Sequence, residues 1–122
     1  MATVNKFESP ANEYASLSEL NLHTLLVGNH HHSIFFSYAQ GNNLRSRGIM
    51  SGDLIIADRA VKPHDGDLVI ALAVDGFVLR VIDLNHRCLR CDNEPSIPLH
   101  GDVIIEATVT QTIRCHRPLQ LN

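Results

Sequence analysis

The stretch AQGNNLRSRGIMSGDLIIAD, residues 39–58, decides the fold class, because a polar glycine-containing loop runs directly into a short apolar strand. The strand follows Gly52-Asp53, which is typical of a tight turn. Gly-Asp followed by aliphatic residues returns at residues 66–70 and 101–105. Because the three copies are unequally spaced, they indicate one turn chemistry used repeatedly rather than a repeat array. Turns that each lead into an apolar strand predict a mainly-β fold.

The other strands are predicted from runs of β-branched and aromatic residues. The predicted strands cover residues 33–39, 54–57, 68–74, 77–84 and 103–115. Asp75-Gly76 separates two of these runs and is a strong hairpin signal. No linker or low-complexity tract interrupts the pattern, so we expect a single compact domain.

The N-terminal segment differs in character from the strands. Residues 1–15 are polar and include Ser9-Pro10, which predicts an extended arm. Leucines recur between residues 16 and 27 at a spacing that predicts one or two helical turns, and Gly28 would end them. The predicted organisation is therefore an arm over residues 1–15 and a mainly-β domain with a short N-terminal helix over residues 16–122.

The composition of the chain restricts its setting. It has 122 residues, 44% of them hydrophobic, and a net charge of -3, which argues against DNA binding through charge alone. The longest apolar run, residues 68–74, is too short to cross a bilayer, and residues 1–6 do not resemble a secretory signal. Three cysteines are an odd number, so a reducing, cytoplasmic setting is the simpler expectation.

Two groups of potential metal ligands also have an ordinary structural interpretation. The first is the histidine run His30, His31 and His32. Alternate side chains of an extended chain point to opposite faces, so three consecutive histidines cannot all face one metal. The second group is Cys88 and Cys91 with the distant Cys115, but the close pair lies in a predicted strand rather than around a turn. We therefore expect neither a metal nor a cofactor.

Several segments of the chain form a recognisable pattern: the loop Gly41-Asn42-Asn43-Leu44, the later segments 48–58, 65–71 and 75–80, and the earlier segments 9–14 and 21–26. Through these segments most of the chain resembles the peptidase-type domain shared by the UmuD and LexA self-cleaving proteins. The similarity is closest to UmuD, which in that family is the accessory subunit of an error-prone polymerase that copies damaged DNA. The resemblance implies a fold of curved antiparallel sheets.

In that family a loop serine is the nucleophile, and a lysine on the strand after the hairpin is the general base. The match places Asn43 at the serine position and Arg80 at the lysine position. An amide has no ionisable nucleophile, and a guanidinium stays protonated in a protein. The resemblance therefore implies a degenerate peptidase that is not an enzyme.

Replacement reagents are few. Ser46 and Ser51 lie near the loop, but Lys62 is the only lysine downstream of it, in a predicted turn rather than on the hairpin strand. A triad that uses His64 is equally weak. We expect no displaced catalytic site.

Arg80 lies among apolar residues on its predicted face of the strand. A buried guanidinium needs hydrogen-bond acceptors, and the side-chain oxygen of Asn43 could be one. The alternative is an arginine that reaches solvent over the edge of the sheet. The sequence leaves both possibilities open.

The resemblance also implies partners. Eight residues precede Ser9 and none is glycine, whereas the family cleaves at an Ala-Gly or Cys-Gly bond in this region, so the chain is similar to the processed form of UmuD. That form implies a homodimer associated with a UmuC-type polymerase or the RecA filament. The alternative is a regulator that forms heterodimers with an active UmuD or LexA relative. Without a helix-turn-helix segment, we expect no sequence-specific DNA binding.

The last predicted strand offers a candidate dimer contact. Polar and apolar residues alternate along residues 103–115, which suits an edge strand that pairs with its twin. The alternative is an ordinary interior strand. The candidate contact residues on one face are Ile104, Glu106, Thr108 and Thr110.

Overall fold

The computed structural model describes residues 32–117, which form one sheet of seven strands. The strands are β1 (Ile34–Tyr38), β2 (Leu54–Asp58), β3 (Leu68–Ala73), β4 (Gly76–Asp83), β5 (Cys88–Arg90), β6 (Ile97–Pro98) and β7 (Ile104–Ile113). One turn of 3-10 helix, η1 (Arg45–Arg47), lies in the loop between β1 and β2. No helix in this part of the chain is long and apolar enough to cross a membrane.

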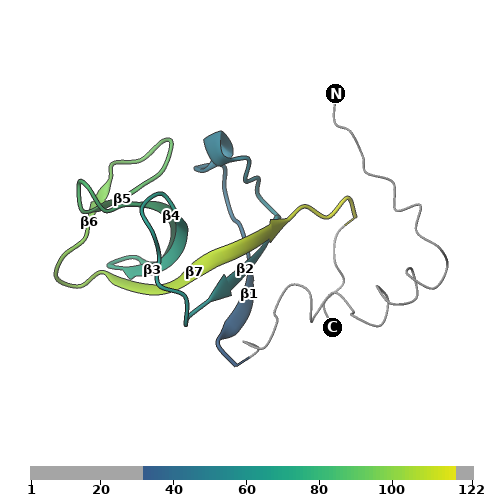
Figure 1. The fold of residues 1–122 in the computed structure, drawn as a ribbon. Coiled ribbons are helices and arrows are strands. Elements are labelled where there is room, and N and C mark those ends of the chain that lie inside the picture. Colours follow the sequence, from purple (N-terminus) through teal and green to yellow (C-terminus); the bar gives the residue numbers. More distant parts are fainter. Residues whose placement is uncertain (1–31, 118–122) are drawn as a thin grey trace. The chain divides into compact units, whose positions relative to one another are not determined.

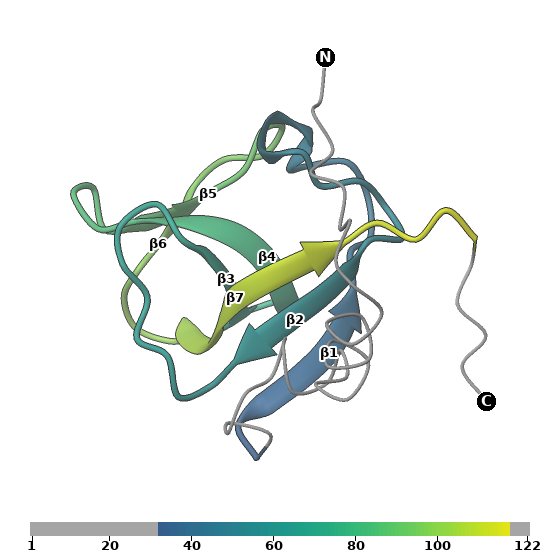
Figure 2. The same ribbon diagram turned by 45° about the vertical axis from the view of Figure 1, so that its right-hand side comes forward.

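The strand order is β1-β2-β7-β3-β4-β5-β6, and every neighbouring pair is antiparallel. The last strand of the sequence, β7, therefore lies inside the sheet, between β2 and β3 (Figure 1). Figure 2 shows β1, β2 and β7 lying side by side. The expectation that residues 103–115 form an edge strand is wrong, because β2 and β3 already occupy the two sides of β7.

β7 changes its partner along its length. Its first half pairs with β3, from Ile104 to Thr108, and its second half pairs with β2, from Thr108 to Ile113. The register shifts once against each neighbour, which leaves Glu106 opposite no residue of β3 and Thr110 opposite no residue of β2. Such bulges bend a strand and increase its twist, so the sheet curves at β7.

Two apolar clusters lie on opposite faces of β3. The first core contains Ala39, Leu44, Ile49, Ile55, Ala57, Ile70 and Ala107. The second core contains Val69, Ala71, Ile82 and Leu89. Because successive side chains of a strand point to opposite faces, Val69 and Ile70 enter different cores. A strand buried on both faces needs apolar residues at every position, which explains the continuous run LVIALA in β3.

Two of the three Gly-Asp turns have the same geometry. Asp53 accepts a hydrogen bond from the amide of Met50 at 2.9 Å, and Asp67 accepts one from the amide of His64 at 2.8 Å. In both turns the aspartate amide also donates to the carbonyl of that same upstream residue. The preceding glycines, Gly52 and Gly66, have φ angles of 95° and 88°, which side chains disfavour. The third turn differs, since Val103 rather than Asp102 donates to His100.

The strand predictions are confirmed for β1, β2, β3, β4 and β7 to within two residues at each end. The short strand β6, which contains Pro98, was not predicted, because it has only two residues and pairs with β5 alone. The predicted arm over residues 1–15 and helix over residues 16–27 lie outside the described residues. The mainly antiparallel β fold is the one that the resemblance implied.

Candidate functional site

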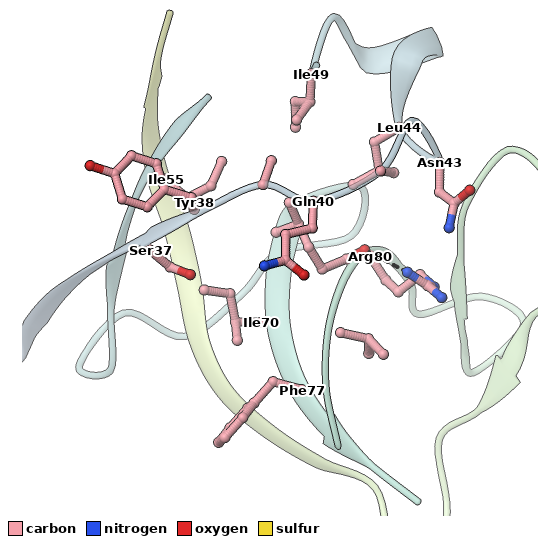
Figure 3. Close-up of a pocket in the computed structure, with 14 residues that line it drawn as sticks. Ser37, Tyr38, Gln40, Asn43, Leu44, Ile49, Ile55, Ile70, Phe77 and Arg80 are labelled. Atoms are coloured by element: carbon pink, nitrogen blue, oxygen red, sulfur yellow. Dashed lines mark hydrogen bonds between the residues drawn. The ribbon is translucent and has the colours of Figure 1, made fainter. Parts of the chain in front are cut away.

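A pocket of about 380 Å³ opens where the loop after β1 faces strands β3 and β4. Its walls are mainly apolar side chains, with Asn43 and Arg80 at one end (Figure 3). The lining residues are Ser37, Tyr38, Ala39, Gln40, Gly41, Asn43, Leu44, Ile49, Ile55, Ile70, Phe77, Val78, Leu79 and Arg80. The structure therefore brings the two predicted dyad positions into one pocket, although they lie on separate elements.

The loop is held in place by its own apolar residues. Leu44 and Ile49 are buried in the first core, and the amide of Ile49 donates to the carbonyl of Leu44 at 3.2 Å. Gly48 ends the η1 turn in the left-handed conformation. This packing fixes the position of Asn43, which immediately precedes Leu44.

Asn43 contacts the segment between β5 and β6. Its side-chain Nδ2 donates to Oε1 of Glu94 at 3.1 Å, and its backbone carbonyl accepts a hydrogen bond from the amide of Asp92 at 2.7 Å. The amide of the neutral side chain thus serves as a donor to a carboxylate. It offers no nucleophile.

Arg80 is buried, with 8% of its surface exposed, and it points toward the same carboxylate. Its Nη2 donates to Oε2 of Glu94 at 2.5 Å, and its Nη1 donates to the carbonyl of Leu79 at 2.9 Å. Its Nε is buried and has no hydrogen-bond partner. The ion pair with Glu94 compensates the charge of a group that would be costly to bury alone.

Neither of the two alternatives for Arg80 is correct. Arg80 does not extend into solvent, and within residues 32–117 no hydrogen bond joins it directly to Asn43. Instead the two oxygens of Glu94 bridge the two side chains. A guanidinium that donates to a carboxylate cannot take a proton from a nucleophile, so Arg80 is not a general base in this arrangement.

The alternative reagents are engaged elsewhere. The hydroxyl and amide of Ser46 both donate to the carboxylate of Asp92, at 2.5 and 2.9 Å. These bonds from Ser46 hold the pKa of Asp92 below its usual range. The hydroxyl of Ser51 accepts a hydrogen bond from the amide of Gly41. Lys62 lines a different pocket, of about 240 Å³.

A second ion pair, between Asp53 and Arg114, stabilises the segment that follows η1. Asp53 is buried and accepts hydrogen bonds from Nε and Nη2 of Arg114, each at 2.9 Å. The Arg114 guanidinium, followed by the amide of Met50, lowers the pKa of Asp53. Nη2 of Arg114 also donates to the carbonyl of Gly48 at 2.7 Å. The residue just after β7 therefore fixes both ends of the segment that follows η1.

The histidine and cysteine groups that were considered as metal ligands are described only in part. Within residues 32–117, no group of three or more His, Cys, Asp or Glu side chains is placed to share a metal ion. Cys88 is buried, Cys91 packs against the first core, and all three cysteines are free thiols. His32 is exposed, whereas His30 and His31 lie outside the described residues.

The four candidate dimer residues have different environments. Thr108 is buried, and its hydroxyl donates to the carbonyl of Val61 at 2.7 Å, so it is committed within the chain. Ile104 is 52% exposed and Thr110 is exposed. Glu106 is half-buried and lines the second pocket. A dimer contact through the exposed residues stays a prediction.

Glu94 was not identified from the sequence, although it is the central residue of the site. Its signal was weak: an acidic residue in the irregular segment between two short strands, next to Pro95. Only the pairing of β5 with β4 brings that segment to Arg80. A search for a carboxylate to compensate a buried arginine would have been the way to find it.

Comparison with known proteins identifies the family of the chain. Residues 3–110 match the model of the Peptidase S24-like family. The chain is 41% identical over 82 residues to Protein ImpA of Salmonella typhimurium, an alignment that covers 66% of this chain and 54% of ImpA. It is 34% identical over 92 residues to Protein SamA of Salmonella typhimurium strain LT2, an alignment that covers 75% of this chain and 64% of SamA.

A third relative, Protein MucA of Escherichia coli, is 32% identical over 84 residues, covering 68% of this chain and 56% of MucA. The chain spans about half the length of the curated relatives it matches first. ImpA, SamA and MucA are relatives of UmuD. The family match covers most of the chain, and the chain therefore belongs to the Peptidase S24-like family, among its UmuD-like members.

Proposed function

We propose that this chain is a non-catalytic UmuD-like protein of the SOS response to DNA damage. In this role it is a dimeric accessory subunit of a UmuC-type translesion polymerase. The observation that supports the proposal is the bridge from Asn43 through Glu94 to Arg80, which occupies the two positions where the family resemblance expects a serine and a lysine.

The chemistry of the pocket supports a role in binding rather than cleavage. Nucleophilic catalysis by this family requires a hydroxyl beside a neutral amine that can accept its proton. Here one position is a carboxamide, and the other is a guanidinium paired with a carboxylate. The hydroxyl of Ser46 donates to Asp92, and neither residue lines the pocket.

The accessory role rests on the resemblance to UmuD. A protein that has lost both reagents yet keeps its fold retains surfaces on which partners can bind. The UmuD-like relatives support a partner of the kind found in the DNA-damage response.

A second function rests on the same resemblance to the UmuD and LexA proteins. A chain of this kind could form a heterodimer with an active UmuD or LexA relative and alter the self-cleavage of that relative. We regard this regulator as the alternative.

Co-purification separates the two functions. The tagged chain is mixed in turn with a purified UmuC-type polymerase and with a cleavable UmuD-type or LexA-type relative, each at micromolar concentration. The accessory role predicts recovery of the polymerase, whereas the regulator predicts recovery of the relative and a changed rate of its self-cleavage. Light scattering of the chain alone tests the homodimer, and recovery of neither partner would contradict both functions.

A further inference from the structure

The guanidinium of Arg80 is only partly used by its neighbours. Its side chain is only 9% exposed. Nη1 and Nη2 both donate hydrogen bonds, but Nε is buried and has no hydrogen-bond partner. Nε and one Nη lie on the same edge of an arginine and can together hold the two oxygens of one carboxylate. Glu94 makes its single contact at Nη2, so this edge of Arg80 is incompletely satisfied.

The pocket beside Arg80 suits an apolar ligand group. Ile55 and Ile70 line it, together with the side chain of Phe77, which is 69% exposed (Figure 3). Among the described residues that line this pocket, Arg80 alone carries a charge. A ligand with an apolar body and one negative group therefore matches both the walls and the end of the pocket.

Glu94 has the properties of an internal occupant of that position. Its side chain is 50% exposed, and from the segment between β5 and β6 it contacts Asn43 and Arg80, which line the pocket. Its hydrogen bond to Asn43 is exposed, and its hydrogen bond to Arg80 is partly buried. A carboxylate from a ligand could take the same two donors, and Glu94 could turn into solvent at little cost because it is already half exposed.

We propose that this pocket binds a peptide carboxylate that lies next to an apolar side chain, with Arg80 and Asn43 as its donors and Glu94 as the group it displaces. The inference rests on the proposed non-catalytic function, because a peptide held here must stay intact. The carboxylate pairs with Nε and Nη2 of Arg80, and the apolar side chain contacts the wall that contains Ile70 and Phe77. The ligand is thus selected by charge as well as by apolar contact.

The proposal is tested with four short acetylated peptides and the whole chain labelled with ¹⁵N. One pair is Ala-Leu-Val with a free terminal carboxylate and the same peptide as its terminal amide. The other pair is Ala-Glu-Leu-Val amide and its glutamine counterpart. The Nε–H resonance of Arg80 and the side-chain amide of Asn43 are followed by NMR during each titration. If the peptide with the free terminus shifts these resonances, the ligand group is a terminal carboxylate. If the glutamate peptide shifts them, the ligand group is a side-chain carboxylate. Either result supports the proposal.

We expect an acidic peptide to bind more tightly than its neutral counterpart by about tenfold or more, as for a charge-assisted pair. Glu94→Gln should tighten this binding, by about tenfold if Glu94 occupies Arg80 for roughly 90% of the time. The matched control is Asp102→Asn, which removes an exposed carboxylate that does not line this pocket and should leave binding unchanged.

Equal affinity for acidic and neutral peptides would overturn the proposal, as would unshifted Arg80 and Asn43 resonances at millimolar peptide. The wild-type titration decides this even if Glu94→Gln folds poorly. The masses of the recovered peptides distinguish failure of the carboxylate site from failure of the proposed non-catalytic function. Intact peptides without binding contradict the carboxylate site alone, whereas cleaved peptides contradict the non-catalytic function.

Discussion

A serine and a lysine introduced at positions 43 and 80 should not be reactive while Glu94 remains. The variant Asn43→Ser with Arg80→Lys places a hydroxyl and an amine at the positions where the family resemblance implies them. In the present structure Nη2 of Arg80 lies 2.5 Å from Oε2 of Glu94, so a lysine at this position would lie beside the same carboxylate. An opposite charge at hydrogen-bond distance stabilises the protonated amine, which cannot act as a base.

The size of this effect can be worked out. An unperturbed lysine has a pKa of about 10.4, so roughly one amine in a thousand is neutral near pH 7.4. A neighbouring carboxylate raises that pKa by about 1–3 units and lowers the neutral fraction by a further factor of about 10 to 1,000. Adding Glu94→Gln removes the carboxylate, and burial of a position that is now 8% exposed then lowers the lysine pKa instead.

The assay is the rate of covalent labelling by a fluorophosphonate, followed by the mass of the intact protein. The triple variant should label at least about tenfold faster than the double variant, because its neutral amine is at least that much more abundant. The control is the triple variant with alanine in place of the new serine, which should not label. Equal rates for the double and triple variants would refute the reasoning, because Glu94 would then have no influence on the amine.

Three further predictions concern the support of the site. Leu44→Ala should lower the free energy of unfolding in urea by about 2–4 kcal/mol, because Leu44 anchors the loop in the first core. Arg114 lowers the pKa of Asp53 below its ordinary value of 3.8, so the stabilisation is complete above that pH and is lost as the pH falls through the lowered pKa. Arg114→Gln should therefore flatten the acid side of a plot of Tm against pH, and an unchanged slope would contradict this. Thr108→Val should cost about 0.5–1.5 kcal/mol in urea unfolding, because the buried Thr108 loses its hydrogen bond to the carbonyl of Val61.

The local features of the fold could be predicted because they depend on residues close together in the sequence. Period-two alternation and β-branched runs located five of the strands, and Asp75-Gly76 gave the β3–β4 hairpin. The position of β7 could not be predicted in the same way. Its alternation of polar and apolar residues fits an edge strand as well as a bulged interior strand, and only the pairing with β2 and β3 distinguishes them.

The site was predicted in part for the same reason. The resemblance identified Asn43 and Arg80, and the structure brings both into one pocket. The sequence did not predict the partner of Arg80, because Glu94 lies 14 residues further along the chain in an irregular segment without a strand pattern. Burial of a charge implies that a compensating group exists, but its identity depends on the path of the segment between β5 and β6.

The most direct test of the proposal that this chain has no peptidase activity is a cleavage assay in trans. The substrate is a UmuD-type relative that retains its cleavage segment but has alanine in place of its own nucleophilic serine. It is incubated with this chain or, as a positive control, with an active Ser-Lys relative, and the products are measured by mass spectrometry. We predict that the substrate stays intact with this chain over the time in which the active relative cuts it completely. Cleavage fragments that form with this chain would contradict its assignment as a non-catalytic member of the family.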